Sequence, residues 1–202
     1  MSEKTSGSTS WGKFALLAVP AIFIGSAMAG LTATGAMASS FAVSGDSFKV
    51  QADRLEGDGF AQYGDVVFDI EDEDHGVAPA GIQEARLFNM CQSAVYDTPI
   101  GEFTVRVTAG TEEDNPVTAT NLIVDTNDIQ GDASFSNIEI GRDASTLDQV
   151  SDHQGAAGSF GQQSDTIAID GLRQETWGIT AGRFNFENLH VSVTRGTEEE
   201  CY

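Results

Sequence analysis

The feature that most constrains the fold is an alternation of apolar and polar residues with a period of two, which runs through residues 41–202. In residues 103–107 and 189–193, for example, every second side chain is apolar. Because successive side chains of a strand point to opposite faces, this pattern predicts strands that each bury one face. Turn-forming residues at 57–59 (Gly-Asp-Gly) and 113–116 (Glu-Asp-Asn-Pro) separate the runs. Further strands are expected at residues 48–50, 66–70, 121–124, 133–135, 138–140, 167–169 and 184–186.

The predicted class is therefore all-β, with a sandwich or jelly-roll-like domain as the favoured architecture. A β-solenoid or an open β-groove is the alternative. Residues 83–93 could form one short helical turn, but their apolar spacing also suits a strand. A weak internal echo places an Asn directly before an apolar residue at Asn89, Asn121, Asn137 and Asn188. The echo predicts a recurring device in which the Asn forms a turn and the next side chain enters the core.

Residues 141–164 lack alternation and are rich in small and polar side chains. They predict one long loop. Loops of this length inside a compact domain are usually functional or contact surfaces.

The N-terminal part differs from everything that follows. Residues 1–13 are polar, and residues 14–38 form a run of 25 uncharged residues. Such a run is long enough to cross about 30 Å of hydrocarbon as a retained transmembrane helix. Ala36-Met-Ala38 also fits a signal-peptide cleavage pattern, so secretion after cleavage near Ala38 is the alternative. The remaining 39–202 would be an extracytoplasmic domain. Residues expected to face the membrane or a neighbouring helix are Phe14, Leu17, Ile22, Gly25, Ala29 and Gly30.

The chain is strongly acidic. Its formal net charge is -21, and residues 39–202 alone carry 8 Lys and Arg against 30 Asp and Glu, a net charge of -22. Binding of nucleic acid depends on Lys and Arg that neutralise phosphates, so this composition argues against it. It also disfavours docking on anionic lipid headgroups, and it favours solubility and basic partners.

The chain has two cysteines, Cys91 and Cys201. Disulfides persist in extracytoplasmic compartments, so a Cys91–Cys201 bond is expected to hold the C-terminus against the domain. The alternative is a pair of unbonded thiols, one buried and one at the chain end.

The chain resembles a group of exported actinobacterial proteins of unknown function. The resemblance covers most of residues 40–202, besides the apolar leader, and is carried by residues 52–57, 59–64, 89–93, 131–141, 158–163 and 200–202. It implies a location in the cell envelope and places both cysteines in segments typical of the family. Some members carry the label cholesterol esterase in genomes, but the resemblance implies no activity.

A serine esterase would need an activated nucleophile, for which Ser159 in Ala157-Gly-Ser-Phe-Gly161 is the nearest candidate, with His153, His75 or His190 as base. A nucleophile elbow belongs between a strand and a helix of an α/β sheet, whereas this segment is predicted to be a loop in a β domain. We therefore expect no enzyme.

Two acidic stretches could supply oxygen ligands to Ca²⁺, although neither has the spacing of an EF-hand. The candidate ligands are Asp69, Glu71, Asp72, Asp125, Asp128 and Asp132. Solvated acidic loops explain these stretches equally well, so no cofactor is expected beyond this possible ion. Aromatic residues are expected mainly in the core. Those that could instead line an apolar groove are Phe135, Phe160, Trp177, Phe184 and Phe186.

Together these observations predict a non-enzymatic protein on the extracytoplasmic face of the cell membrane. Residues 14–38 would hold it in the membrane or in a homo-oligomer, and edge strands and the 141–164 loop would contact other envelope proteins. A carrier of lipid or another apolar ligand is the alternative function.

Overall fold

The computed structural model describes residues 46–69 and 73–202. The predicted segment at 14–38, with the six residues expected to face the membrane, lies outside the described residues, as do Glu71 and Asp72. The described part contains no helix with the length and apolarity that a membrane crossing would require.

The described residues form ten β-strands and one short 3₁₀ helix, which confirms the all-β prediction. The strands are β1 (Phe48–Tyr63), β2 (Asp65–Phe68), β3 (Asp74–Phe88), β4 (Met90–Thr98), β5 (Gly101–Ala109), β6 (Val117–Ser136), β7 (Glu139–Asp143), β8 (Phe160–Thr180), β9 (Arg183–Asn185) and β10 (His190–Arg195), with the helix η1 (Ala144–Thr146) between β7 and β8. Apart from Asn89, residues 83–93 belong to β3 and β4, so the strand interpretation of that segment is the correct one.

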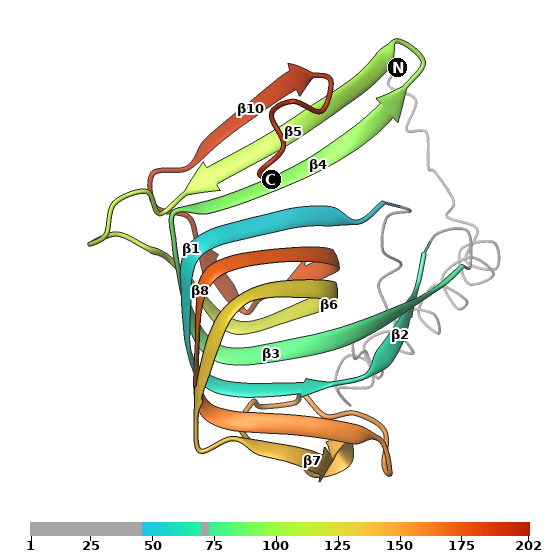
Figure 1. The fold of residues 1–202 in the computed structure, drawn as a ribbon, viewed down its shortest axis with the longest axis vertical. Coiled ribbons are helices and arrows are strands. Elements are labelled where there is room, and N and C mark those ends of the chain that lie inside the picture. Colours follow the sequence, from blue (N-terminus) through green and yellow to red (C-terminus); the bar gives the residue numbers. More distant parts are fainter. Residues whose placement is uncertain (1–45, 70–72) are drawn as a thin grey trace, which may run out of the picture. The chain divides into compact units, whose positions relative to one another are not determined.

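All ten strands belong to one antiparallel sheet with the order β10-β5-β4-β1-β3-β6-β8-β7; β2 pairs with β3, and β9 pairs with β6. The sheet also closes on itself because β1 pairs with β8 along its whole length. The strands β1, β3, β6 and β8 therefore form a ring without a free edge, and their opposing walls face each other across the core (Figure 1). The strands β4, β5 and β10 extend away from this ring.

Several strands are far longer than the sequence pattern predicts, because residues expected to form turns lie inside them. The predicted turn at Gly57-Asp-Gly59 is part of the 16-residue strand β1. Gly57 is required there by close packing, since a Cβ on it would lie 2.6 Å from a methyl group of Ile82. The 20-residue β6 and the 21-residue β8 change register at three places near Thr126 and Asp132. Such irregularities bend strands and help a sheet to close.

The main core fills the ring. It contains the buried side chains of Leu55, Ile82, Leu122, Ile169 and Leu172, together with the aromatic ring of Phe60 and several Val and Ala residues. Cores packed from alternating strand residues in this way provide the main free energy of folding.

The loop predicted at 141–164 is shorter than expected, because β7 continues to Asp143 and β8 begins at Phe160. The remaining segment is not a detached excursion. It buries Leu147 and Val150 against Ala61 and Tyr63 in a second, smaller core. The loop is therefore packed on the ring.

The four Asn residues of the internal echo share one backbone conformation. Asn89, Asn121, Asn137 and Asn188 all have φ between 49° and 55°. Asn tolerates this left-handed region better than other residues with a side chain. The predicted device is therefore present as a backbone feature. The prediction that the side chain after the Asn enters the core is correct for Met90 and Leu122, which are buried. It is wrong for Ile138 and Leu189, which are exposed.

Candidate interaction surface

The strands β4, β5 and β10 form a three-stranded sheet whose two faces differ in chemistry. Cross-strand partners point to the same face of an antiparallel sheet. One row of partners joins Ala94, Val105 and Val193, and the next joins Gln92, Val107 and Val191. In the alternate rows, Ser93 lies beside Arg106 and Ser192. The sheet therefore has one mainly apolar face, which includes Gln92, and one mainly polar face, which includes Val95.

We call the first of these the β10–β5–β4 apolar face. Its members are Ala94 and Tyr96 on β4, Phe103, Val105 and Val107 on β5, and Leu189, Val191 and Val193 on or beside β10. Val191 and Val193 expose 54% and 63% of their surface, and Tyr96 exposes 48%. Large side chains of this type are more often buried, and a contiguous exposed group of them marks an interaction site.

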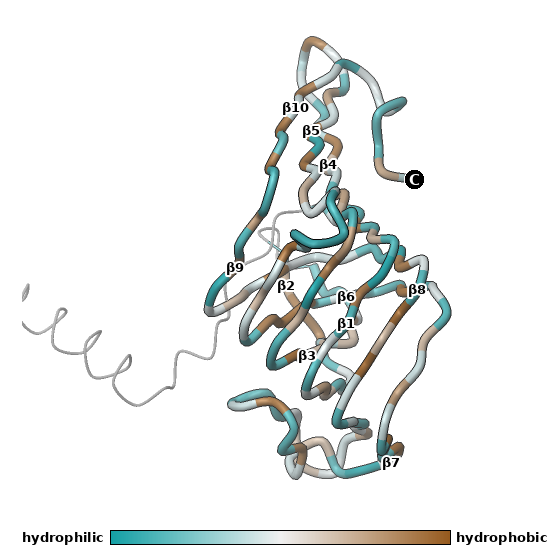
Figure 2. Tube along the Cα trace, turned by 90° about the vertical axis from the view of Figure 1, so that its left-hand side faces the viewer, coloured by the Kyte–Doolittle hydropathy of each residue, from teal (hydrophilic) through white to brown (hydrophobic). Residues whose placement is uncertain are grey.

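The polar face of the same sheet is covered by the C-terminal tail, residues 196–202. The hydroxyl of Thr104 donates to the carbonyl oxygen of Gly196 at 2.6 Å, and the guanidinium of Arg106 lies 3.1 Å from a carboxylate oxygen of Glu199. The backbone N–H of Cys201 donates to the hydroxyl of Ser93. In Figure 2 the tail lies on one side of β4, β5 and β10. It thus covers only the polar face.

The tail is fixed covalently as well. The sulfur atoms of Cys91 and Cys201 are 2.09 Å apart, at disulfide-bond distance, as the sequence predicts. Beside this bond, the Lys49 ammonium contacts Glu200, and both Lys49 and Arg173 lie over the ring of Tyr202.

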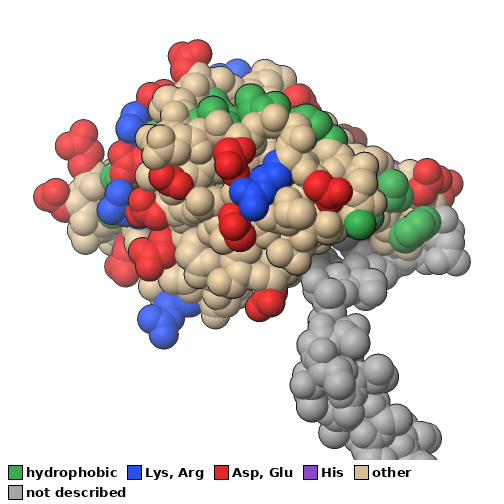
Figure 3. All heavy atoms as spheres, turned by 90° about the horizontal axis from the view of Figure 1, so that it is seen from below, with side chains coloured by type: hydrophobic (Ala, Val, Ile, Leu, Met, Phe, Trp, Pro, Cys, Tyr) green, Lys and Arg blue, Asp and Glu red, His purple; other side chains and the backbone are tan. Residues whose placement is uncertain are grey.

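The apolar face is also free of negative charge. None of its members is acidic, and the residues 188–196 that contain β10 include no Asp or Glu, although the whole chain has 31. Elsewhere the surface is rich in carboxylates; Figure 3 shows Asp and Glu side chains spread over the view from below. The face is therefore a neutral area on an acidic molecule.

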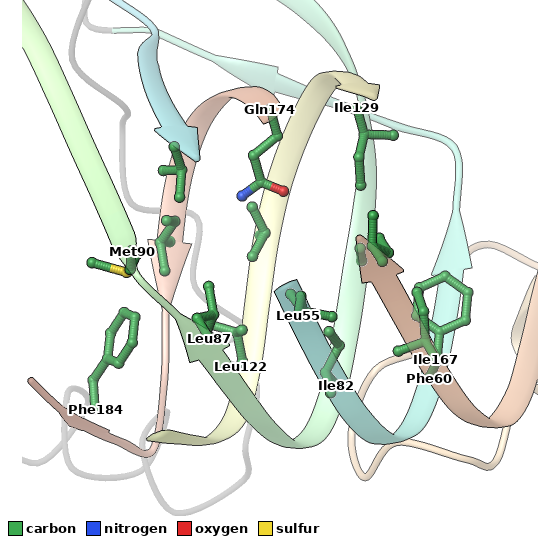
Figure 4. A pocket seen from close by; sticks show the side chains of 15 residues that line it. Leu55, Phe60, Ile82, Leu87, Met90, Leu122, Ile129, Ile167, Gln174 and Phe184 are labelled. Atoms are coloured by element: carbon green, nitrogen blue, oxygen red, sulfur yellow. The ribbon is translucent and has the colours of Figure 1, made fainter. Parts of the chain in front are cut away.

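The predicted apolar groove does not form as one site. Of its five residues, only Phe184 lines the void inside the ring (Figure 4). Phe135 packs on Phe60, Phe186 packs on Phe184, Trp177 stacks on His75, and Phe160 is 59% exposed at the start of β8.

The void is apolar apart from Gln174, and its volume is about 40 Å³. Pockets that hold drug-sized ligands measure roughly 300–1,000 Å³. A lipid chain would therefore require the walls of the ring to separate.

The two residues of the esterase hypothesis make hydrogen bonds to different groups. The Ser159 hydroxyl donates to the carbonyl oxygen of Ala156 at 2.6 Å, whereas Nε2 of His153 lies 3.3 Å from the carbonyl oxygen of Pro79. His153 is buried against Tyr63 and Gly81, and this burial lowers the pKa of its imidazole. Neither contact links the base to the nucleophile as catalysis by this pair would require.

The candidate calcium ligands are distributed over separate places. Asp69 is buried; its carboxylate accepts from the Glu73 N–H and lies 3.0 Å from Nε2 of His75. Asp128 and Asp132 are exposed. Within residues 46–69 and 73–202, no three His, Cys, Asp or Glu side chains are grouped as a metal site would need.

Among the candidate ligands, Asp125 has a carboxyl group with a perturbed pKa. It is half-buried, and this burial raises the pKa of its carboxyl group, with a further contribution from the nearby negative charge of Asp65. Burial similarly raises the pKa of the Tyr63 hydroxyl.

The sequence pattern locates the strands of the apolar face but not its exposure. The alternation in 103–107 and 189–193 predicts one buried face for each strand, whereas Val191 and Val193 are exposed. The alternation gives the same signal whether the apolar face of a strand is covered or exposed.

Comparison with known proteins gives a family but no activity. A model described as a family of unknown function, DUF6230, matches residues 44–202. No curated protein and no solved structure matches the chain significantly.

Proposed function

Since the chain belongs to DUF6230, a family of unknown function, we propose a role from its own geometry: it is a non-enzymatic protein of the cell envelope whose β domain binds another protein. The contact is made by the β10–β5–β4 apolar face. The exposure of Val191, Val193 and Tyr96 on one face carries this proposal.

The chemistry of the face supports a protein partner. Protein interfaces are depleted in charge at their centre and enriched in aromatic residues. The face matches this composition, with valines at its centre and Phe103 and Tyr96 toward one end. Arg195, opposite Phe103, is its only charged neighbour in the β10 row.

The location is part of the same proposal. Residues 14–38 would anchor the protein so that the domain stands on the extracytoplasmic face of the membrane, with secretion after cleavage near Ala38 as the alternative. The actinobacterial and exported character that the resemblance implies fits this location. A Ca²⁺ ion is not needed for the proposed contact.

Site-specific photo-crosslinking in native membranes tests the proposal. Tyr96 would be replaced by a benzophenone-bearing phenylalanine, which keeps an aromatic side chain at an exposed site. The matched control carries the same group at Thr197, in the tail on the polar side of the sheet. The full chain is used in both cases, and adducts are identified by mass.

The proposal predicts one defined protein adduct from position 96 and its absence from position 197. The same adducts from both positions would indicate non-selective contact and contradict the proposal. Adducts of lipid mass alone at position 96 would instead support the lipid-binding alternative. If the protein hydrolyses an ester substrate and Ser159→Ala abolishes this activity, the esterase hypothesis would replace the proposal.

A further inference from the structure

The strand β10 ends the sheet and leaves one row of backbone groups unpaired within the described residues. Its only partner there is β5. The N–H of Gly196 donates to the carbonyl oxygen of Glu102, in register with the β10–β5 ladder. Because hydrogen-bonded residues alternate along an antiparallel pair, Ser192 and Thr194 also point their backbone groups toward β5. The N–H and C=O groups of Val191, Val193 and Arg195 therefore point to the open edge.

This edge has few of the features that usually prevent pairing. Proteins protect edge strands with charged side chains, Pro, bulges or short length. The strand β7, at the other end of the sheet order, has a register shift at Arg142, which binds Glu139. The strands β2 and β9 have four and three residues. By contrast, β10 is a regular six-residue strand without Pro, and among Lys, Arg, Asp and Glu it contains one residue, Arg195 at its last position.

We propose that the open edge of β10 pairs with β10 of a second copy of this chain, in antiparallel orientation. Charge determines where on the surface a second copy can approach. Two copies with a net charge of -21 repel each other, and residues 188–196 are a segment where they can approach without bringing carboxylates together. A basic partner would instead be attracted to the acidic parts of the surface.

The register of the proposed β10–β10 pairing follows from the alternation of apolar and polar side chains along β10. Pairing aligns the apolar faces of the two copies only when odd-numbered residues oppose odd-numbered residues. Centring the pair on Ser192 satisfies this condition and uses the whole extended segment. Val191 then opposes Val193 of the second copy, and the two Ser192 residues oppose each other. Such a pairing is isologous, as expected for a twofold dimer.

The pairing is separate from the contact proposed above. It uses backbone groups at the edge, whereas the apolar face uses side chains that point out of the sheet. The dimer would join two apolar faces into one six-stranded surface. Two linked copies of a contact surface raise the avidity for a partner that can reach both.

Cysteine cross-linking of the full chain in its membrane or in mild detergent tests the inference. Both native cysteines are bonded to each other, so Ser192→Cys introduces the single free thiol. Opposed residues of a non-hydrogen-bonded pair have Cα atoms about 4.5 Å apart, within the disulfide range of about 4.4–6.8 Å. The matched control is His190→Cys, exposed on the same face of the same strand. Its two copies would lie four residues apart, about 13 Å.

Under mild oxidation we expect Ser192→Cys to form a covalent dimer linked through position 192 of both copies. We expect no covalent dimer with His190→Cys. Adding Val191→Pro to Ser192→Cys should also abolish the dimer, because this removes an N–H that points to the open edge and leaves the β5 ladder intact. Equal cross-linking at positions 190 and 192, no dimer at either, or a disulfide adduct of Ser192→Cys to a different protein would overturn the inference. These outcomes do not depend on the adducts formed at position 96.

Discussion

Removal of the disulfide has the largest expected effect on stability. The bond joins Cys91 to Cys201 across 110 residues. In the chain-entropy model, closing a loop of this length restricts the unfolded chain and stabilises the fold by about 5 kcal/mol. The variant Cys91→Ala/Cys201→Ala should lose most of this free energy of unfolding. Alanine is preferred to serine because Cys91 is buried.

The structure predicts that the tail is released before the rest of the fold. Without the bond, residues 196–202 are held by two partly exposed ion pairs, Lys49–Glu200 and Arg106–Glu199, by the Tyr202 ring contacts and by hydrogen bonds to Thr104 and Ser93. A hydrogen bond contributes about 0.5–1.5 kcal/mol net. Exposed pairs contribute about 0.2–1 kcal/mol each. Ordering the backbone of a residue costs about 1–2 kcal/mol. Six or seven ordered residues therefore outweigh the remaining contacts.

Two measurements on the full chain separate the global effect from the local one. Denaturant unfolding should show a lower midpoint in the variant, and hydrogen exchange should show lost protection in the tail and at the N–H of Cys201. The Glu199→Gln variant, which keeps the disulfide, is the control for the ion pair. An unchanged midpoint would refute the chain-entropy argument, and a tail that remains protected would refute the estimate of its contacts.

Three further predictions concern single side chains. Asn121→Ala should lower the free energy of unfolding by about 1–2 kcal/mol more than Asn121→Gly, because both lose the hydrogen bond to Gln83 but only Ala is strained at φ 49°; equal losses in denaturant unfolding would contradict this. Burial lowers the pKa of His153, so the unfolded chain binds a proton that the fold excludes, and stability should fall as pH drops below about 6.5; His153→Gln should reduce this dependence in unfolding measured at several pH values. Burial raises the pKa of Asp125, so its carboxylate opposes folding at neutral pH; Asp125→Asn should raise the thermal midpoint there, and the gain should shrink in acid, whereas a lower midpoint at neutral pH would contradict the argument.

Local features of the fold were predictable because short-range sterics determine them. The repeated Asn followed by an apolar residue predicted turns. All four Asn residues adopt the left-handed conformation, although Asn121 lies inside strand β6 and not in a turn. This restriction acts within one residue, so a single sequence shows it. The strand alternation likewise follows from the backbone geometry of each segment.

Long-range features were not predictable from the same patterns. The glycines at 57 and 59 predict a turn, but in the structure Gly57 packs against Ile82 inside a continuous strand. A glycine gives the same signal where the chain turns and where another chain segment approaches closely. The closure of the ring by β1 and β8 depends on residues more than 100 positions apart, such as Leu55 and Ile169. Nothing local to either strand specifies that pairing.

The exposure of the β10–β5–β4 apolar face is another feature that local sequence patterns do not predict. Two stretches without Asp or Glu, residues 85–96 and 115–124, lie mainly in strands and contain Leu87, Met90, Val117 and Leu122, all buried. Residues 188–196 have the same composition, yet Val191 and Val193 are exposed. The composition and alternation of a segment usually agree with its burial in the fold. A segment where they disagree is expected at a functional site. A strand with core composition at an open edge is therefore what we expect if the proposed contact buries these side chains in the assembled protein.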